Sequence, residues 1–270
     1  MRVGPALRPV ASHSPMSRVW LLDLDNTLHN ATPVVFPRID RAMTAFVQER
    51  LGVSREDADA LRLHYWRRYG ATLLGLVRHH DVDPHEFLRD THPFPDLERI
   101  VRRDRRLAAA LRSLPGRRVV LTNAPSAYAH RVLRALGVTR FVHDVVPIES
   151  MRFAGRLQPK PSRPQLRRLA ARLRVAPASC VLVEDSVQNL QAARAVGMRT
   201  VLVTGFGHGH RHASGRPRIA RGRWLDAQLH SVATLPRRAK AAAGRIRLPR
   251  DVMAPKRRRR LAGLLVGDSS

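Results

Sequence analysis

The segment at residues 19–30, VWLLDLDNTLHN, constrains the fold more than any other part of the chain. Its nearly continuous apolar run, residues 19–22, is typical of a strand that is covered on both faces in a parallel sheet. Two carboxylates, Asp23 and Asp25, follow the run directly. Ligands of parallel sheets bind just beyond the carboxyl ends of the strands, whereas a turn alone does not need two acids there. The segment therefore predicts a parallel sheet with chemistry at one edge.

The second half of the chain repeats this type of strand in alternation with helices. Strands are predicted within residues 117–124, 141–150, 179–186 and 199–205, and helices within 126–137, 162–175 and 187–197. Strands that alternate with helices of about 10 to 15 residues imply parallel pairing through right-handed crossovers. The predicted fold class is therefore α/β, with a Rossmann-like, doubly wound parallel sheet.

A helical block separates the first strand from this alternating region. Apolar side chains recur at helical spacing in residues 38–51, and Gly52 ends the pattern. Ser54 is placed as the N-cap of a second helix that stops at Gly70, and two shorter helices follow up to about residue 90. We expect a helical cap over residues 33–95, inserted after strand one of a catalytic core formed by residues 18–32 and 96–207.

The net charge of +28 points to contact with nucleic acid or another anionic partner. Lysine occurs only three times, however, and an excess of arginine is typical of GC-rich codon usage. The charge is densest after residue 210, so we expect a basic, flexible extension over residues 208–270 that contacts polyanions without specificity. Residues 1–17 are expected to be disordered, with Met16 as an alternative start.

The composition also bears on location. No apolar run approaches the roughly 20 residues that span a bilayer, and residues 1–17 lack the apolar centre of a secretory signal. The single cysteine, Cys180, cannot form an internal disulfide, in keeping with a reducing compartment. These features predict a cytoplasmic protein without a membrane partner.

Polar side chains follow the predicted strands wherever these end, and a lysine lies on a loop between two of them. The set comprises Asp23, Asp25, Thr122, Asn123, Lys160, Glu184 and Asp185. The carboxyl ends of parallel strands share one edge of the sheet, so these groups can converge. Carboxylates with a hydroxyl and one cation suit Mg²⁺ bound to a phosphate. Lys160 can then hold the phosphate charge, while Thr122 and Asn123 donate hydrogen bonds to its oxygens.

The spacing of the two aspartates suits covalent phosphate transfer. One aspartate attacks phosphorus and becomes an aspartyl-phosphate, which divides a difficult displacement into two easier steps. The second carboxylate protonates the leaving oxygen and later activates water. Residues two apart on an extended chain point the same way, which explains why one residue separates the acids.

Four segments of the chain, LLDLDNTL, LTNA, PKP and VEDSVQN, resemble the four motifs of the haloacid dehalogenase (HAD) superfamily in order and spacing. The resemblance covers about residues 18–205. It implies that Asp23 is the nucleophile and a Mg²⁺ ligand. It also implies that Asp25 is the general acid and base, with its backbone carbonyl on the metal.

The same resemblance assigns the other core residues. Thr122 and Lys160 match the phosphate-binding pair, and Asp185 matches a direct metal ligand. Glu184 and Asn189 are expected to hold water or to orient the ligands. Dehalogenases of this superfamily work without metal and lack the second aspartate, so Asp25 favours phosphatase chemistry.

A narrower resemblance, to pyrimidine 5′-nucleotidases, rests on DLDNTLH, on residues 65–87 of the cap and on residues 184–203. It implies hydrolysis of UMP or CMP to nucleoside and phosphate, although the basic tail departs from that family. Two alternatives remain open. One is a phosphatase for a sugar phosphate, phosphoglycolate or a similar small phosphomonoester, and the other is a nucleic-acid-binding protein on a HAD scaffold.

One cap helix is predicted to contact the substrate. Tyr65, Arg68 and Tyr69 lie within about one helical turn, where they could stack on a base or contact the sugar. The competing interpretation is that these aromatic side chains belong to the core of the cap.

Overall fold

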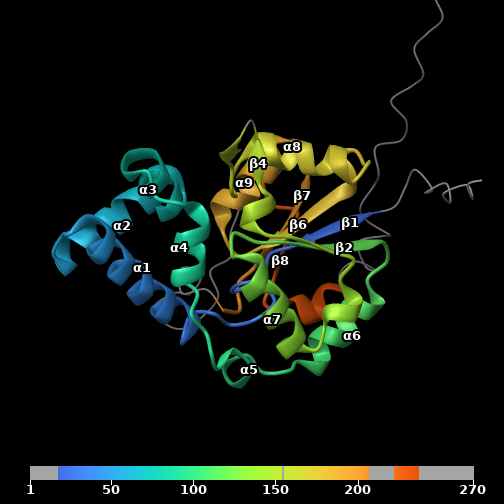
Figure 1. The fold of residues 1–270 in the computed structure, drawn as a ribbon. Helices are drawn as coiled ribbons and strands as arrows, with labels where there is room; N and C mark the ends of the chain where they lie inside the picture. The colour runs from blue at the N-terminus through green and yellow to red at the C-terminus, as the bar shows by residue number, and fades with distance from the viewer. Residues whose placement is uncertain (1–17, 154, 207–221, 237–270) are drawn as a thin grey trace, which may run out of the picture. The chain divides into compact units, whose positions relative to one another are not determined.

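The computed structural model describes residues 18–153, 155–206 and 222–236. Its central element is a sheet of six strands (Figure 1). The strands are β1 (Val19–Leu22), β2 (Arg117–Leu121), β3 (Asp144–Val146), β6 (Cys180–Glu184), β7 (Arg199–Val203) and β8 (Ala227–Leu229). Their order is β3-β2-β1-β6-β7-β8, and every neighbouring pair is parallel. The predicted α/β class with a parallel sheet is confirmed.

Strand β1 lies between β2 and β6, and all four of its residues are buried. Val19 pairs with Arg117 on one side and with Cys180 on the other. A strand in this position is covered on both faces and carries apolar side chains throughout. Its apolar sequence therefore follows from its central place in the sheet.

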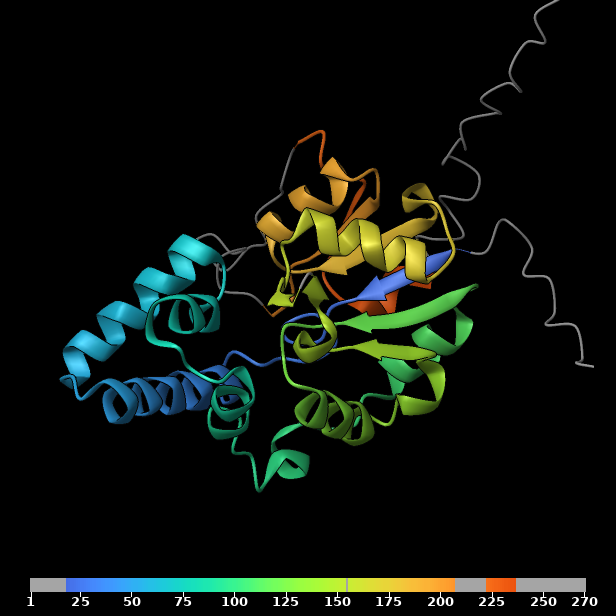
Figure 2. The same ribbon diagram turned by 45° about the horizontal axis from the view of Figure 1, so that its top comes forward.

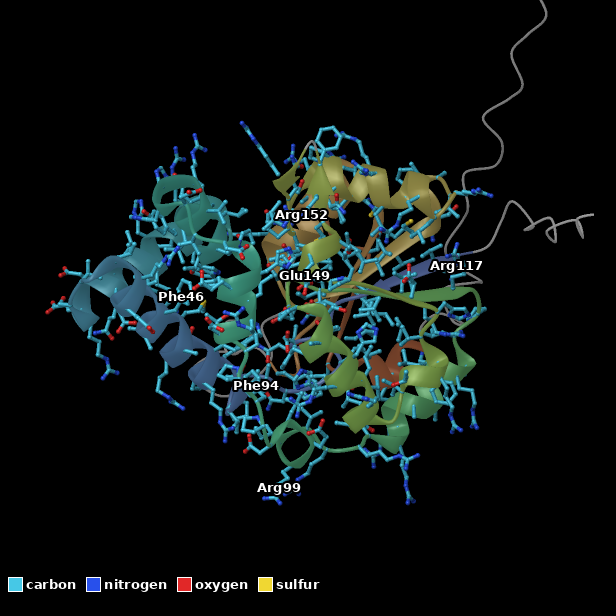
Figure 3. The ribbon with its side chains drawn as sticks, viewed as in Figure 1. Phe46, Phe94, Arg99, Arg117, Glu149 and Arg152 are labelled. Carbon is cyan, nitrogen blue, oxygen red and sulfur yellow. The ribbon has the colours of Figure 1, made fainter. Side chains whose placement is uncertain are left out.

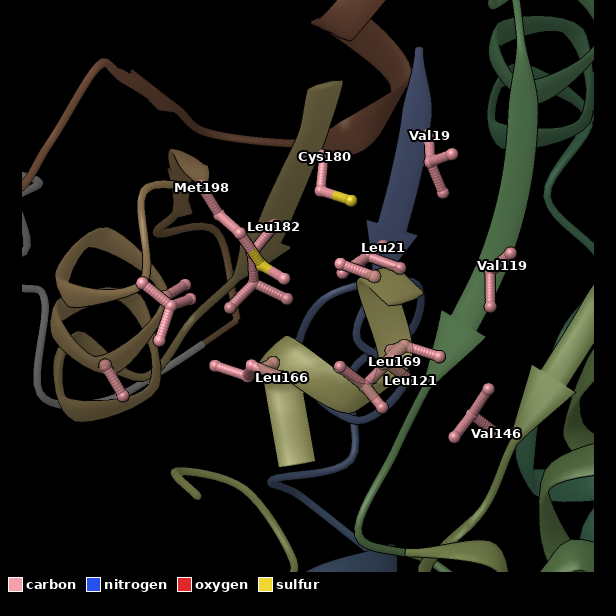
Figure 4. Packing of buried hydrophobic residues seen from close by; sticks show 14 of the residues in the cluster. Val19, Leu21, Val119, Leu121, Val146, Leu166, Leu169, Cys180, Leu182 and Met198 are labelled. Carbon is pink, nitrogen blue, oxygen red and sulfur yellow. The ribbon is translucent and has the colours of Figure 1, made fainter. Parts of the chain in front are cut away.

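Helices cover both faces of the sheet (Figure 2). On one face lie α8 (Arg163–Arg172) and α9 (Val187–Ala195), and on the other lie α6 (Arg105–Ser113) and α7 (Ser126–Leu136). Leu166 and Leu169 of α8 pack with Leu21 and Leu182 of the sheet in one buried cluster (Figure 4). The sheet is doubly wound, as predicted.

The chain between β1 and β2 is a helical insertion. Its helices are α1 (Val35–Leu51), α2 (Arg55–Tyr69), α3 (Thr72–His80), α4 (Pro84–Asp90), α5 (Leu97–Ile100) and α6. The first four form a cap with a hydrophobic core of its own, in which Phe46 (Figure 3) meets Phe87 edge to face at 5.2 Å. Ser54 caps α2 by accepting the backbone N–H of Asp57.

Smaller elements connect the main ones. A two-stranded hairpin follows β3, and short 3₁₀ segments flank several strands. They are β4 (Arg152–Phe153), β5 (Arg156–Leu157), η1 (Thr139–Phe141), η2 (Ile148–Ser150), η3 (Pro177–Ser179) and η5 (Val232–Thr234). Among the described residues, no helix is long and apolar enough to cross a membrane.

The predicted boundary between core and basic extension is wrong. Strand β8 and η5 fall inside the expected extension, yet β8 completes the sheet beside β7, and Leu229, Val232 and Leu235 are buried. A strand of only three residues shows too little periodicity to be found from sequence. The core continues to Pro236, whereas the predictions for residues 1–17, 207–221 and 237–270 lie outside the described residues.

Candidate active site

One cavity of about 560 Å³ opens between the carboxyl edge of the sheet and the cap. Every core residue that the sequence singled out lines it, namely Asp23, Asp25, Thr122, Asn123, Lys160, Glu184, Asp185 and Asn189. The strand pairing explains this convergence. The backbone N–H of Asp23 donates to the carbonyl of Val183 (3.0 Å), and that of Thr122 donates to the carbonyl of Val146 (3.1 Å). These residues therefore lie where neighbouring strands end together.

Lys160 is the central cation of the site. Its Nζ donates to Oδ1 of Asp23 (2.5 Å) and to Oε2 of Glu184 (2.7 Å), and its side chain is only 4% exposed. Asn123 holds the loop that carries it. The Asn123 amide accepts from the Lys160 backbone N–H (2.9 Å) and donates to the Lys160 carbonyl (3.0 Å). Asn123 was predicted as a phosphate donor, and in the structure its side chain positions the lysine.

The site holds more negative than positive charge. Burial, and next the charge of Glu184, raise the pKa of Asp23 to about 7. Burial is also the main reason that the pKa is about 7 for Glu184 and about 6 for Asp185. Burial lowers the pKa of Lys160, but the two carboxylates beside it outweigh burial and raise that pKa above its ordinary value. Three carboxyl groups around one lysine favour an additional cation.

The carboxyl groups also have the arrangement that a metal ion needs. Oxygens of Asp23, Glu184 and Asp185 lie within 4.8 Å of one another, and such hard oxygen donors suit Mg²⁺. Glu184 uses both oxygens within the protein, since Oε2 pairs with Lys160 and Oε1 accepts the Ser186 backbone N–H (3.2 Å). This pattern agrees with an orienting role for Glu184, and the donor set fits the metal that the sequence predicts.

Asp25 has partners of a different kind. Its Oδ1 accepts from the Tyr128 hydroxyl (2.6 Å) and lies 2.9 Å from Nε2 of His29. Burial raises the pKa of Asp25, but the hydrogen bonds from His29 and Tyr128 and the charge of His29 together hold that pKa below its ordinary value. Phe94 of the segment returning from the cap (Figure 3) packs 5.4 Å from the Tyr128 ring. Asp25 is therefore held where chain segments of cap and core meet.

Three of these contacts were missed at the level of sequence. Thr27 donates to Oδ2 of Asp23 (2.9 Å), and His29 contacts Asp25. Thr27 lies inside the first motif and His29 directly follows it, so their spacing of four residues from Asp23 and Asp25 was a usable signal. Tyr128 lies 103 residues from Asp25, and no local pattern indicates that pairing.

Thr122 is buried, and its Oγ1 accepts the Ala124 backbone N–H (3.0 Å). With that oxygen fixed, the hydroxyl proton can be donated to an oxygen in the cavity. The position is suited to the phosphate contact that was predicted for this residue.

The structure does not bring Tyr65, Arg68 or Tyr69 to the cavity. Tyr65 is buried in the cap, and its hydroxyl pairs with His80 (2.7 Å). Its ring fills the space that Gly75 leaves, since a Cβ there would lie 2.1 Å from Cγ of Tyr65. The residues of α2 that were predicted to contact the substrate thus lie elsewhere: the aromatic pair packs toward α3, and Arg68 is exposed.

An adjacent strip of α2 lines the cavity instead. Arg62, Leu63 and Trp66 belong to it, and Asp40 of α1 lies beside them. Successive residues of a helix are about 100° apart, so residues 62, 63 and 66 form a strip that lines the cavity and adjoins the strip formed by residues 65 and 69. Sequence reasoning missed these residues because aromatic and basic side chains occur all around α2.

A family model described as haloacid dehalogenase-like hydrolase matches residues 18–197. The chain belongs to this family of hydrolases. The match extends from the first strand to the end of α9, so it includes every site residue described above.

Individual relatives are distant. Phosphate metabolism protein 8 of Saccharomyces cerevisiae is 23% identical over 205 residues, which are 70% of this chain and 62% of the yeast protein. CbbY from Rhodobacter sphaeroides, solved in complex with phosphate, has a TM-score of 0.54 at 22% identity and covers 82% of this chain and 96% of its own. A HAD phosphatase from Thermococcus onnurineus has a TM-score of 0.53 at 18% identity, with coverages of 83% and 98%. At these identities the structures show a common fold.

Proposed function

We propose that this protein is a Mg²⁺-dependent phosphomonoester hydrolase that works through an aspartyl-phosphate on Asp23. The observation that carries the proposal is the buried Lys160 between Asp23 and Glu184, with Asp185 beside them at the carboxyl edge of the sheet. A phosphate oxygen and a metal ion are the partners that such a cluster accommodates. The phosphatase and the phosphate complex among the similar structures support the same chemistry.

In the first step a carboxylate oxygen of Asp23 attacks phosphorus, and the ester oxygen leaves. Lys160 and Thr122 stabilise charge on the phosphoryl oxygens. Asp23, Asp185 and the Asp25 backbone carbonyl would hold Mg²⁺, which would supply positive charge for the phosphoryl oxygens. Asp25 is placed to pass a proton to the leaving oxygen, and because its pKa is held below its ordinary value it must first take that proton up.

In the second step water attacks the phosphorus of the aspartyl-phosphate, which releases phosphate and restores the Asp23 carboxylate. Asp25 takes the proton from that water. His29 and Tyr128 contact one oxygen of Asp25, Oδ1, and so hold the orientation of the group that transfers protons.

For the substrate we propose a pyrimidine nucleoside 5′-monophosphate, UMP or CMP. The cavity volume of about 560 Å³ lies within the range of about 300 to 1,000 Å³ common for small-molecule sites. Apolar cap residues, among them Phe36 and Trp66, are part of its lining. An apolar wall suits a base better than it suits a bare sugar or a carboxylate. The resemblance of the cap and of the fourth motif to pyrimidine 5′-nucleotidases supports the same assignment.

The test is hydrolysis of UMP and of p-nitrophenyl phosphate by Asp23→Asn and wild type, with Mg²⁺ and after chelation. We expect the variant to lose turnover because an amide is a poor nucleophile, and we expect chelation to abolish the wild-type rate. Asp81→Asn is the matched control, since Asp81 is exposed and its φ of 51° suits asparagine. Rapid acid quenching of the wild type should reveal a phosphoryl adduct by mass spectrometry. Turnover by folded Asp23→Asn, or a rate unchanged by chelation, contradicts the mechanism.

A further inference from the structure

The cap side of the cavity carries polar groups that the proposed reaction leaves unused. Arg62 of α2 donates from Nη1 to Oδ1 of Asp40 (2.7 Å) and from Nη2 to Oδ1 of Asp59 (3.4 Å). Its side chain is 14% exposed, and both Arg62 and Asp40 line the cavity. The guanidinium is thus held in one orientation by two carboxylates.

Arg62 has hydrogen-bond capacity beyond these contacts. A guanidinium has five N–H donors, and the two contacts with Asp40 and Asp59 use one each. Its Nε is buried and has no acceptor in the described part of the chain. Donors therefore remain for a ligand, and the Asp40 carboxylate, half exposed, can accept from the same ligand.

Apolar surface adjoins this polar pair. Trp66 is 58% exposed and Leu63 is 38% exposed, which places both among the most exposed large hydrophobic residues described. Both line the cavity, one turn or less from Arg62 on α2. An exposed tryptophan beside oriented polar groups is suited to stacking on a flat ring.

The charges that line the cavity predict the orientation of the bound substrate. Around Arg62, the carboxylates of Asp40 and Asp59 outnumber the single guanidinium, so this end disfavours an anionic group. Lys160 and the carboxylates proposed to hold the metal line the same cavity from the core. A phosphomonoester therefore binds with its phosphate at Lys160 and an uncharged leaving group at α2, which disfavours substrates such as phosphoglycolate whose leaving group carries a carboxylate.

We propose that Trp66, Arg62 and Asp40 recognise the base of the nucleotide, with Trp66 stacking on the ring and the polar pair contacting its edge. The inference rests on the proposed function. Arg62 would donate to a ring acceptor while Asp40 accepts from the adjacent N–H. Uracil offers a carbonyl beside its ring N–H, and cytosine offers a ring nitrogen beside its amino group. The specificity of the enzyme is then determined by the strip of α2 that adjoins the aromatic residues of the cap.

The experiment compares kcat/KM for UMP and for ribose 5-phosphate, which has the same phosphate and sugar without the base. We expect Trp66→Ala and Arg62→Met each to lower kcat/KM for UMP by about tenfold or more and to change that for ribose 5-phosphate by less than about threefold. Trp66→Phe should restore most of the loss because it keeps a ring for stacking. Arg67→Met is the control, since Arg67 is exposed on the same helix and does not line the cavity.

The outcomes distinguish a wrong substrate class from a wrong role for α2. If the wild type fails to hydrolyse UMP or prefers ribose 5-phosphate, the proposed substrate class is wrong before any variant is compared. If the wild type prefers UMP but Trp66→Ala and Arg62→Met lower both rates equally, or lower neither, the recognition role of α2 is overturned. Folding is not expected to obscure the result, because Trp66 is largely exposed and the carboxylates left by Arg62→Met are 41% and 50% exposed.

Discussion

Replacing Lys160 with methionine should destabilise the metal-free protein strongly. The side chains of Lys160, Asp23 and Glu184 are 4%, 7% and 2% exposed, so the substitution leaves two buried carboxyl groups without their cation. Removal of one partner from a buried ion pair costs about 3–5 kcal/mol. For a domain of this size, that corresponds to a fall in Tm of about 10 °C.

The loss should depend on pH in a defined direction. In the unfolded chain such carboxyls titrate near pH 4, whereas in the folded chain Asp23 and Glu184 have pKa values of about 7, chiefly through burial. The folded state therefore binds more protons between about pH 4 and 7, and its stability falls as pH rises through that window. Lys160 lowers both pKa values. Without Lys160 both pKa values rise further. The loss of unfolding free energy in the variant should therefore be larger at pH 8 than at pH 5.

The assay is denaturant unfolding of chelated protein at pH 5 and pH 8, followed by circular dichroism. Arg131→Met is the matched control, because it breaks the surface pair of Arg131 with Glu98, whose N–O distances of 2.7 and 2.9 Å are comparably short. Exposed pairs contribute little, so this variant should unfold close to wild type at both values of pH. If Lys160→Met unfolds like the control, or if its deficit is the same at pH 5 and pH 8, Lys160 does not neutralise the carboxylates as argued.

Two further predictions follow from the packing. Tyr128→Phe removes the 2.6 Å hydrogen bond to Asp25 and should lower kcat for UMP by about tenfold with little change in KM; a purely structural role would instead lower stability and leave kcat intact. A chain ending at Pro236 should keep its activity and lose salt-sensitive binding to heparin. A chain ending at Phe206 should unfold more readily, because it lacks β8 and the buried Leu229, Val232 and Leu235. Equal stability of the two truncated chains would show that β8 is dispensable.

The identity of the core residues could be predicted from sequence because each motif is local. Asp23 and Asp25 directly follow a strand whose apolar run can be recognised within a few residues, and Glu184 and Asp185 end another such run. Once the strands are parallel, their carboxyl ends share one edge, and the acids, Thr122 and Lys160 reach the same cavity. A central strand of a parallel sheet is buried on both faces, so its side chains must be apolar throughout. This apolar run can be recognised from the sequence alone.

The orientation of α2, the contact of Tyr128 with Asp25 and the place of β8 depend on which surfaces pack together. Periodicity shows that α2 is a helix but does not determine which face meets α3, and the void at Gly75 decides this by accepting the ring of Tyr65. That contact turns Arg62 and Trp66 toward the cavity. Tyr128 reaches Asp25 across 103 residues of chain, and β8 is recognisable as a strand only beside β7. Local propensity acts between neighbours in sequence, whereas these contacts are selected by the shape and burial of surfaces that only the folded chain brings together.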